Sequence, residues 1–496
     1  MVADPILYVA LPLITAFLLP LFGRIHKELI RIIPGFLFLF LVYNSIVLLT
    51  KVTTEHQPII VQIAGWAPPI GINLVFSSFS GFIASIISVI ALLVWIYSYK
   101  FKKIEFDNAL KYFVLIMLIT AGSIGVVLTG DLFNLFVFLE IVGLSSYPLV
   151  AFYRGRDGAE AAFKYLVIGN LASLFILIGI LIIYSQLRTL NMADIAAHIG
   201  TMPQKLKVTA FIFLFIGIGI EAEMFPLNTW APDAYSQAPG PIGSVFAGMT
   251  AKAGIYAMIR LLYTIFDFSS SFNLLLVMGI ITLVVSEGIA LRQSNLKRML
   301  AYSSLGQMGL LMIAFGINTK AAVVAGLFII FNHAVIKSLL FLSGSLLVYN
   351  STDKHIKYTH GIAKKLPLTS LLFGIGAFAI VGLPPFSGFW GKLYLLMATA
   401  DANMLGLIAL ILAVSLVEIV YYFRVVNGMY FKKAEDEIEI QKPKWNAVLT
   451  MVILALAIIV VGVYPNIIKD YLANAADTIL DKANYIHTVL PSLAIN

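Results

Sequence analysis

The sequence predicts an all-α protein that crosses a membrane many times. Of its 496 residues, 60% are hydrophobic and only 12% are charged, whereas a water-soluble domain usually carries about 25% charged residues. The apolar residues form runs that approach the roughly 20 residues needed to cross a bilayer as a helix. Two of these runs are interrupted by proline and glycine next to charged side chains. Interrupted helices are tolerated at that depth only where they face protein or water, so the breaks indicate a polar interior.

The apolar runs predict about 14 membrane-spanning helices. They are centred on residues 5–22, 31–50, 78–97, 112–129, 131–152, 161–184, 207–227, 242–264, 273–292, 298–316, 322–348, 367–399, 404–425 and 447–467.

The basic residues predict the orientation of these helices. Most of the 33 Lys and Arg fall in loops that follow odd-numbered spans, for example residues 24–31, 99–106 and 430–444. Such loops stay in the cytoplasm by the positive-inside rule, which places both termini outside the cell membrane. The first apolar run lacks a basic start and a cleavage site, so we expect it to be a retained span. Residues 51–75 are expected to form a short hairpin outside, and the chain turns amphipathic after about residue 468.

Two breaks five spans apart indicate an internal repeat. Span 7 is interrupted at residues 225–232 and span 12 at residues 382–392. Paired interrupted helices are typical of inverted-repeat transporters. We therefore expect two inverted five-helix repeats, formed by helices 4–8 and 9–13. The resulting regions are the first three helices (1–110), the two repeats (111–265 and 266–428), and the last helix with its tail (429–496).

Five charged side chains are predicted to lie deep in these spans: Glu140, Lys164, Lys252, Lys337 and Lys392. Each costs roughly 2.5 to 3.5 kcal/mol to insert, so such residues usually serve transport. A buried lysine can exchange its proton near neutral pH, whereas arginine cannot. The alternative to a transport role for Glu140 is a purely structural ion pair with a buried lysine.

Four-residue spacings predict neighbours on two helices. His333 and Lys337 share one helical face, which favours a proton relay over a merely hydrogen-bonded core histidine. Lys252 and Tyr256 repeat the spacing, although the tyrosine taken alone would indicate packing.

Two further carboxylates, Glu287 and Glu418, lie nearer the inner ends of their spans. Arg292 and Arg424 follow them closely and are expected as ordinary partners. Both carboxylates are therefore secondary candidates for the pathway.

The broken segment of span 7 carries Asp233 and Tyr235, which either admit protons or cap the next helix. Lys297 and Arg298 open span 10 and are expected to be orientation charges.

Several chemistries have no support in the sequence. The chain has no cysteine, which excludes disulfides and thiolate metal sites. No nucleotide-binding, zinc-protease or haem motif is present, so we expect no cofactor, no metal site and no catalytic residues. The net charge of +8 belongs to loops between apolar runs rather than to a nucleic-acid-binding face. Whether the chain belongs to an enzyme complex stays open.

Six segments of the sequence, taken together, form a recognisable pattern. They are FLEIVGLSSYPLVAFY, AAFKYLV, FPLNTWAPDAYSQAPGPIGSVFAGMTAKAGIYAMIRL, LKRMLAYSSLGQMG, NHAVIKSLLFLSG and GLPPFSGFWGK. In this order they resemble the antiporter-like subunits shared by respiratory complex I and multisubunit Mrp Na+/H+ antiporters. The resemblance implies 14 helices with helices 7 and 12 broken. It also implies pathway roles for Glu140, Lys252, His333 and Lys337, with Lys392 at the outlet.

One position departs from this family. The family usually has a lysine five residues before the proline of helix 7, paired with the helix-5 glutamate; here that position is Glu221, and Glu223 follows. Either Lys252 or Lys164 then neutralises Glu140, or one carboxylate is protonated. The additional oxygens would also suit a hard cation such as Na+.

The resemblance implies a proton-translocating subunit of a larger complex, with Na+ as a candidate exchange ion. The chain's length points to the D-type Mrp subunits, their complex I homologues, or their counterpart in membrane-bound hydrogenase and sulfane reductase complexes. Other membrane subunits and the lipid bilayer are the expected partners. Two rival hypotheses are a stand-alone carrier of an organic solute and a non-conducting scaffold subunit.

Overall fold

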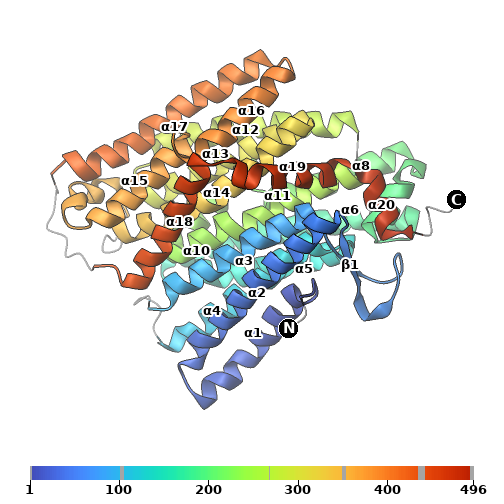
Figure 1. The fold of residues 1–496 in the computed structure, drawn as a ribbon, viewed down its shortest axis with the longest axis horizontal. Helices are drawn as coiled ribbons and strands as arrows, with labels where there is room; N and C mark the ends of the chain where they lie inside the picture. Colours follow the sequence, from blue (N-terminus) through green and yellow to red (C-terminus); the bar gives the residue numbers. More distant parts are fainter. Residues whose placement is uncertain (1–2, 101–105, 267, 349–353, 434–441, 492–496) are drawn as a thin grey trace.

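The computed structural model describes residues 3–100, 106–266, 268–348, 354–433 and 442–491. The described chain is a bundle of long helices (Figure 1). Twelve of the described helices are long and apolar enough to cross a membrane. The expected polytopic all-α fold is therefore confirmed. The basic loops at 99–106 and 430–444 lie partly outside the described residues.

Within its described residues, the first half of the chain contains two strands and eleven α-helices. Their bounds are α1 (Leu7–Ile25), α2 (Leu29–Glu55), β1 (Ile59–Gln62), β2 (Asn73–Phe76), α3 (Ser78–Ser98), α4 (Phe106–Leu128), α5 (Leu132–Val150), α6 (Arg156–Leu187), α7 (Met192–His198), α8 (Gln204–Glu221), α9 (Ala231–Gln237), α10 (Gly240–Val245) and α11 (Ala251–Arg260).

The second half is helical where it is described. Its α-helices are α12 (Ser269–Arg292), α13 (Leu296–Ile317), α14 (Lys320–Leu347), α15 (Pro367–Val381), α16 (Ser387–Asp401), α17 (Leu405–Phe431), α18 (Trp445–Val463), α19 (Asn466–Leu480) and α20 (Lys482–Val489). Short 3-10 turns lie at Ile63–Gly65, Ile199–Thr201, Ile356–Thr359 and Ile362–Lys364, and π-helical turns at Phe246–Thr250 (η3) and Leu261–Ile265 (η4).

Both expected breaks are present. The helix of span 7 stops at Glu221 and resumes as the short α9, and that of span 12 is interrupted between Val381 and Ser387. Prolines in the gaps lack the N–H that would continue a helix. The pieces α8, α15 and α16 are not among the twelve candidate spans of the described chain. The count of 14 spans and the inverted repeats therefore stay predictions.

The most buried spans are Gly240–Ile265, Leu296–Ile317 and Lys320–Leu347. Helices that are apolar on all sides belong in the interior of a large bundle. Around the first of these spans, π-helical turns flank α11 on both sides, a distortion that often marks functional positions. The three buried spans form the centre of the molecule.

Peripheral elements close the bundle. The expected hairpin is an antiparallel pair in which Ile59 lies opposite Phe76. The amphipathic segment after residue 468 is α19, which runs across the bundle in contact with α3 and α14 (Figure 1, red). The polar connection at 185–206 contains α7, against which α20 packs.

One close helix contact places the acidic residues of span 7. The Cα of Gly254 on α11 faces the backbone of Glu221 and Ala222, so closely that a Cβ atom would collide with it. The end of α8 therefore approaches α11 within one turn of Lys252.

Candidate functional site: a buried file of ionisable residues

The centre of the site joins α11 to α14. Lys252 and His333 are completely buried, and the Lys252 ammonium contacts the Nδ1 atom of His333. On the other side of the ring, Nε2 lies 2.8 Å from the Oγ atom of Ser304 on α13. The imidazole thus has one polar neighbour at each nitrogen, which is the geometry a proton relay requires.

Lys337 lies one helical turn beyond His333 and is also completely buried. Its ammonium donates to the Ser303 hydroxyl at 2.6 Å, to the Tyr422 hydroxyl at 3.0 Å and to the carbonyl of Leu300 at 3.4 Å. His333 and Lys337 share one face of α14, and His333 lies within electrostatic reach of both lysines. Their action as a relay stays a prediction.

Beyond Lys337 the file continues through two buried carboxylates. Glu287 on α12 accepts a hydrogen bond from the Tyr421 hydroxyl at 2.8 Å. Glu418 on α17 forms an ion pair with Lys392 and accepts from the amide of Gln307 at 3.0 Å. Both carboxylates lie within electrostatic reach of Lys337.

The expectation of arginine partners for these carboxylates is wrong. In the described chain, Arg424 donates instead to the backbone carbonyls of Leu291 and Gln293, at 3.1 and 2.8 Å. The turn of α17 that carries Glu418 faces the interior, whereas Arg424 lies further along at the surface. Glu287 and Glu418 therefore join the central file.

At the opposite end the file is acidic. The buried Glu223 accepts a hydrogen bond from Tyr235 at 2.7 Å and lies within electrostatic reach of Lys252. Glu221 has Glu140 and Glu223 as its charged neighbours. The Ser173 hydroxyl donates to Glu140.

No lysine forms an ion pair with Glu140 in the described part of the chain, so the alternative in which Lys252 or Lys164 neutralises it is not met; a protonated carboxylate stays the other alternative. Lys252 lies nearer to Glu223, and Lys164 pairs elsewhere. Among the described residues, no group of three or more His, Asp or Glu is arranged to hold a metal ion.

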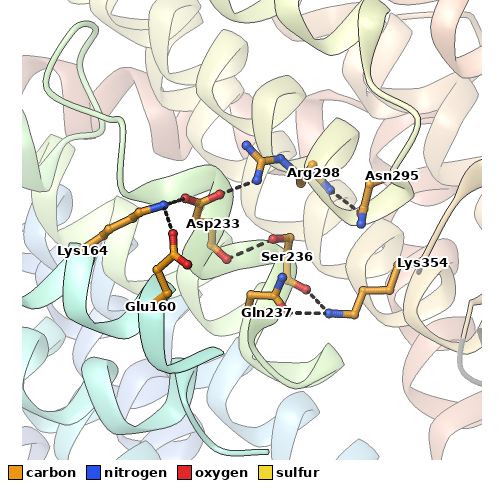
Figure 2. A network of polar contacts seen from close by, with 8 residues as sticks. All are labelled: Glu160, Lys164, Asp233, Ser236, Gln237, Asn295, Arg298 and Lys354. Atoms are coloured by element: carbon orange, nitrogen blue, oxygen red, sulfur yellow. Dashed lines mark hydrogen bonds and ion pairs between the residues drawn. The ribbon is translucent and has the colours of Figure 1, made fainter. Parts of the chain in front are cut away.

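Lys164 is not part of the buried file; Figure 2 shows it among the residues around Asp233. It lies on the third turn of α6 with its side chain 47% exposed, and it pairs with Glu160 at 2.8 Å and with Asp233 at 3.0 Å.

Asp233 does not cap a helix. It lies inside α9, where it pairs with Lys164 and with Arg298 of α13. Arg298 is therefore more than an orientation charge. Lys354 holds the end of the same short helix, since its ammonium donates to the Ser236 carbonyl at 2.8 Å and to the Gln237 side chain at 3.0 Å (Figure 2).

Tyr256 does not extend the file from Lys252. Its ring stacks on Phe79 with 4.7 Å between centroids, and its hydroxyl accepts a hydrogen bond from Arg260 at 2.9 Å. Tyr256 therefore interacts with Arg260, four residues after it, and not with Lys252, four residues before it.

Several polar members of the site carry no charge, and of these the sequence suggested a role in the pathway for Tyr235 alone. They are hydroxyl and amide residues that contact the ionisable groups: Ser173, Tyr235, Ser303, Ser304, Gln307, Tyr421 and Tyr422. The serine pair in LAYSSLGQ and the tyrosine pair in EIVYYFR are weak signals, because apolar spans contain many unremarkable hydroxyls.

Known proteins resemble the chain over most of its length. Residues 129–418 match the family described as "NADH:quinone oxidoreductase/Mrp antiporter, TM". The chain is 33% identical to the N-type subunit of NADH-quinone oxidoreductase from Desulforudis audaxviator (strain MP104C) over 437 residues, covering 86% of each protein. It is 32% identical to the D-type subunit of the Na+/H+ antiporter from Alkalihalophilus pseudofirmus over 496 residues, covering 98% of this chain and 99% of the relative.

A solved structure has the same fold along nearly the whole chain. One chain of the membrane-bound sulfane sulfur reductase, an archaeal respiratory membrane complex, superposes with a TM-score of 0.92 at 38% identity, covering 98% of this chain and 99% of that one. The resemblance expected from the six motifs is thereby confirmed. The chain belongs to the membrane family that NADH:quinone oxidoreductases and Mrp antiporters share.

Proposed function

We propose that the chain is a proton-translocating subunit of a larger membrane complex, in which the buried ionisable residues pass charge across the bundle. The contact between Lys252 and His333 carries the proposal, because it joins the region of the first expected repeat to α14 of the second. Homology to antiporter and quinone oxidoreductase subunits supports it. The pathway comprises Glu140, Glu221, Glu223, Lys252, His333, Lys337, Glu287, Glu418 and Lys392.

Electrostatic coupling moves the protons in this proposal. A charge on Lys252 disfavours a second positive charge on His333 or Lys337, so each protonation displaces a proton further along. Glu223 at one end and the Glu418–Lys392 pair at the other set the charge that the middle lysines experience. The serine and tyrosine hydroxyls provide neutral hydrogen-bonding steps, and water would bridge the remaining gaps.

The energy for transport comes from partner subunits in this proposal, because the sequence shows no redox or nucleotide-binding motif. Both termini lie on the outer side of the cell membrane in this proposal, as the basic loops favour. Protons are the favoured ion, because the lysines and the histidine at the centre of the file can exchange protons but offer no oxygen to a cation; Na+ is the alternative that the additional glutamate keeps open.

Transport by the purified complex in proteoliposomes tests the proposal. Lys252→Met and Lys337→Met should each lower driven proton uptake at least tenfold, because each removes an obligatory protonation site. Lys320→Met is the matched control, because Lys320 lies on the same helix as Lys337 but is exposed and paired with Asp477. Measuring uptake with and without Na+ in the same vesicles shows whether Na+ is exchanged.

Unchanged uptake in both buried-lysine variants would overturn the proposal and favour the scaffold hypothesis. Uptake of an organic solute by this chain without partners would favour the stand-alone carrier.

A further inference from the structure

A buried arginine lies at the far end of α11 from Lys252. Arg260 is only 6% exposed. Its Nε atom donates to the Tyr256 hydroxyl at 2.9 Å, and its Nη1 atom lies 3.4 Å from the Thr264 hydroxyl. The side chain is thus fixed by neutral groups of its own helical region.

Aromatic rings enclose the rest of the guanidinium. Its Cζ atom lies 4.7 Å from the ring centroid of Tyr485, 5.5 Å from that of Tyr256 and 5.9 Å from that of Phe79. No carboxylate pairs with Arg260 in the described part of the chain. Buried charges are normally paired, so a guanidinium held by rings and hydroxyls retains an uncompensated positive charge.

The charge of Arg260 lies on the same helix as Lys252, the proposed proton carrier. Lys252, Tyr256 and Arg260 follow one another at intervals of four residues and share a face of α11. At 1.5 Å per residue, Arg260 lies about 12 Å along the axis from Lys252. The chain before Lys252 leads to α9 and the Asp233 network (Figure 2), whereas beyond Arg260 it leads to the side where α20 packs. Arg260 therefore stands between Lys252 and the surface at α20.

We propose that Arg260, clamped by Tyr256 of its own helix and Tyr485 of α20, is an electrostatic seal that closes the path from Lys252 to the α20 surface. This inference rests on the proposed function, in which Lys252 carries a proton. Guanidinium keeps its charge at any physiological pH, and a fixed positive charge in a low-dielectric constriction repels protons and cations. Burial raises the pKa of Tyr485 to about 12, so its phenol stays neutral and leaves the charge in place.

The seal gives the translocation path its direction. A proton on Lys252 faces Arg260 at one side and His333 at the other. Because passage over the guanidinium is costly, the proton is passed to α14 and onward to Lys392. Without the seal, Lys252 would connect both membrane surfaces within one half of the chain, and the gradient would dissipate.

Passive proton flux tests the seal without turnover of the complex. Proteoliposomes containing the intact complex receive an imposed membrane potential, and a trapped pH dye reports proton entry. Arg260→Met should raise the flux at least fivefold over the native complex. The double variant Arg260→Met/Lys252→Met should return it to the native level, because the leak passes through Lys252.

The control and a second variant make the result decisive. Arg188→Met removes the same charge from an exposed position at the end of α6 and should leave the flux unchanged. Tyr485→Leu weakens the clamp from another helix and should leak measurably, even if Arg260→Met fails to assemble. The seal hypothesis is overturned if passive proton flux stays at the native level in both Arg260→Met and Tyr485→Leu. It is also overturned if the raised flux persists in the double variant Arg260→Met/Lys252→Met. Normal driven transport by both Lys252→Met and Lys337→Met would instead overturn the proposed function.

Discussion

Lys392 and Glu418 form a buried ion pair whose side chains are 11% and 3% exposed. Lys392→Met would leave Glu418 with the amide of Gln307 as its one hydrogen-bonding partner among the described residues. Removing one partner of a buried pair costs about 3 to 5 kcal/mol, because the other charge stays buried and uncompensated. We therefore expect Lys392→Met to lower the thermal stability of the purified protein in detergent clearly, and the double variant Lys392→Met/Glu418→Gln to recover most of the loss.

The exposed pair of Lys320 and Asp477 is the control for this prediction. Its side chains are 57% and 55% exposed, and such pairs contribute about 0 to 1 kcal/mol. Lys320→Met should leave the unfolding temperature almost unchanged. The assignment of a buried, strongly coupled pair would be wrong if the double variant were no more stable than Lys392→Met.

At the residue scale, the sequence was informative about charges and uninformative about their partners. The insertion cost identified Lys252, Lys337 and Lys392 without any knowledge of the fold. It could not show that Glu418 pairs with Lys392, because these residues are 26 positions apart on different helices. For Lys164 the apolar run was misleading, since its helix begins near the surface and the side chain stays exposed.

At the element scale, the contact between α8 and α11 offers a sharp test. Gly254→Ala would place a Cβ atom against the backbone of Glu221 and Ala222. Because backbone cannot move aside as a side chain can, we expect a loss of about 1 to 3 kcal/mol in stability. The displacement would also separate Glu223 from Lys252 and lower driven proton uptake. Thermal unfolding and proteoliposome transport measure the two effects.

Gly288 on α12 is the matched control, because a Cβ atom added there meets nothing within 4 Å. Gly288→Ala should be neutral or raise stability by about 0.5 to 1 kcal/mol, since alanine favours helix. Equal effects of the two substitutions would show that the close helix contact does not position the acidic residues.

Helices and breaks followed from sequence where the signal was strong. Long apolar runs and the prolines at 226, 384 and 385 located the spans and both interruptions. Short elements were harder, because α7 and α20 are seven and eight residues long and have no sustained apolar periodicity. The face of α20 that meets Arg260 depends on tertiary packing, which no local pattern encodes.

At the scale of the whole molecule, the acidic end of the file is incompletely enclosed. Glu140 and Glu221 are only partly buried within this chain, and neighbouring apolar residues on α5 and α6 such as Leu144 and Phe163 are exposed. Under the proposed function, partner subunits or lipid complete this side and supply the driving force. We expect the purified chain alone in liposomes to show no proton uptake above protein-free vesicles under an imposed pH gradient, whereas the intact complex takes up protons when driven.

Transport by the chain alone would contradict this expectation and show that its own helices suffice. The Lys252→Met variant of the chain is the control, because any uptake that survives it does not use the central file.

The two engaged nitrogens of His333 have a kinetic consequence for the molecule as a whole. If the ring receives a proton from Lys252 at Nδ1 and releases one from Nε2 toward Ser304, it is left in the opposite tautomer. A second proton cannot follow in the same direction until the imidazole ring has rotated by a half-turn, or until a proton has returned to Nε2 from the Ser304 side. The two halves of the chain therefore exchange protons one at a time, and the reset of a single imidazole sets an upper limit on the turnover of the entire file.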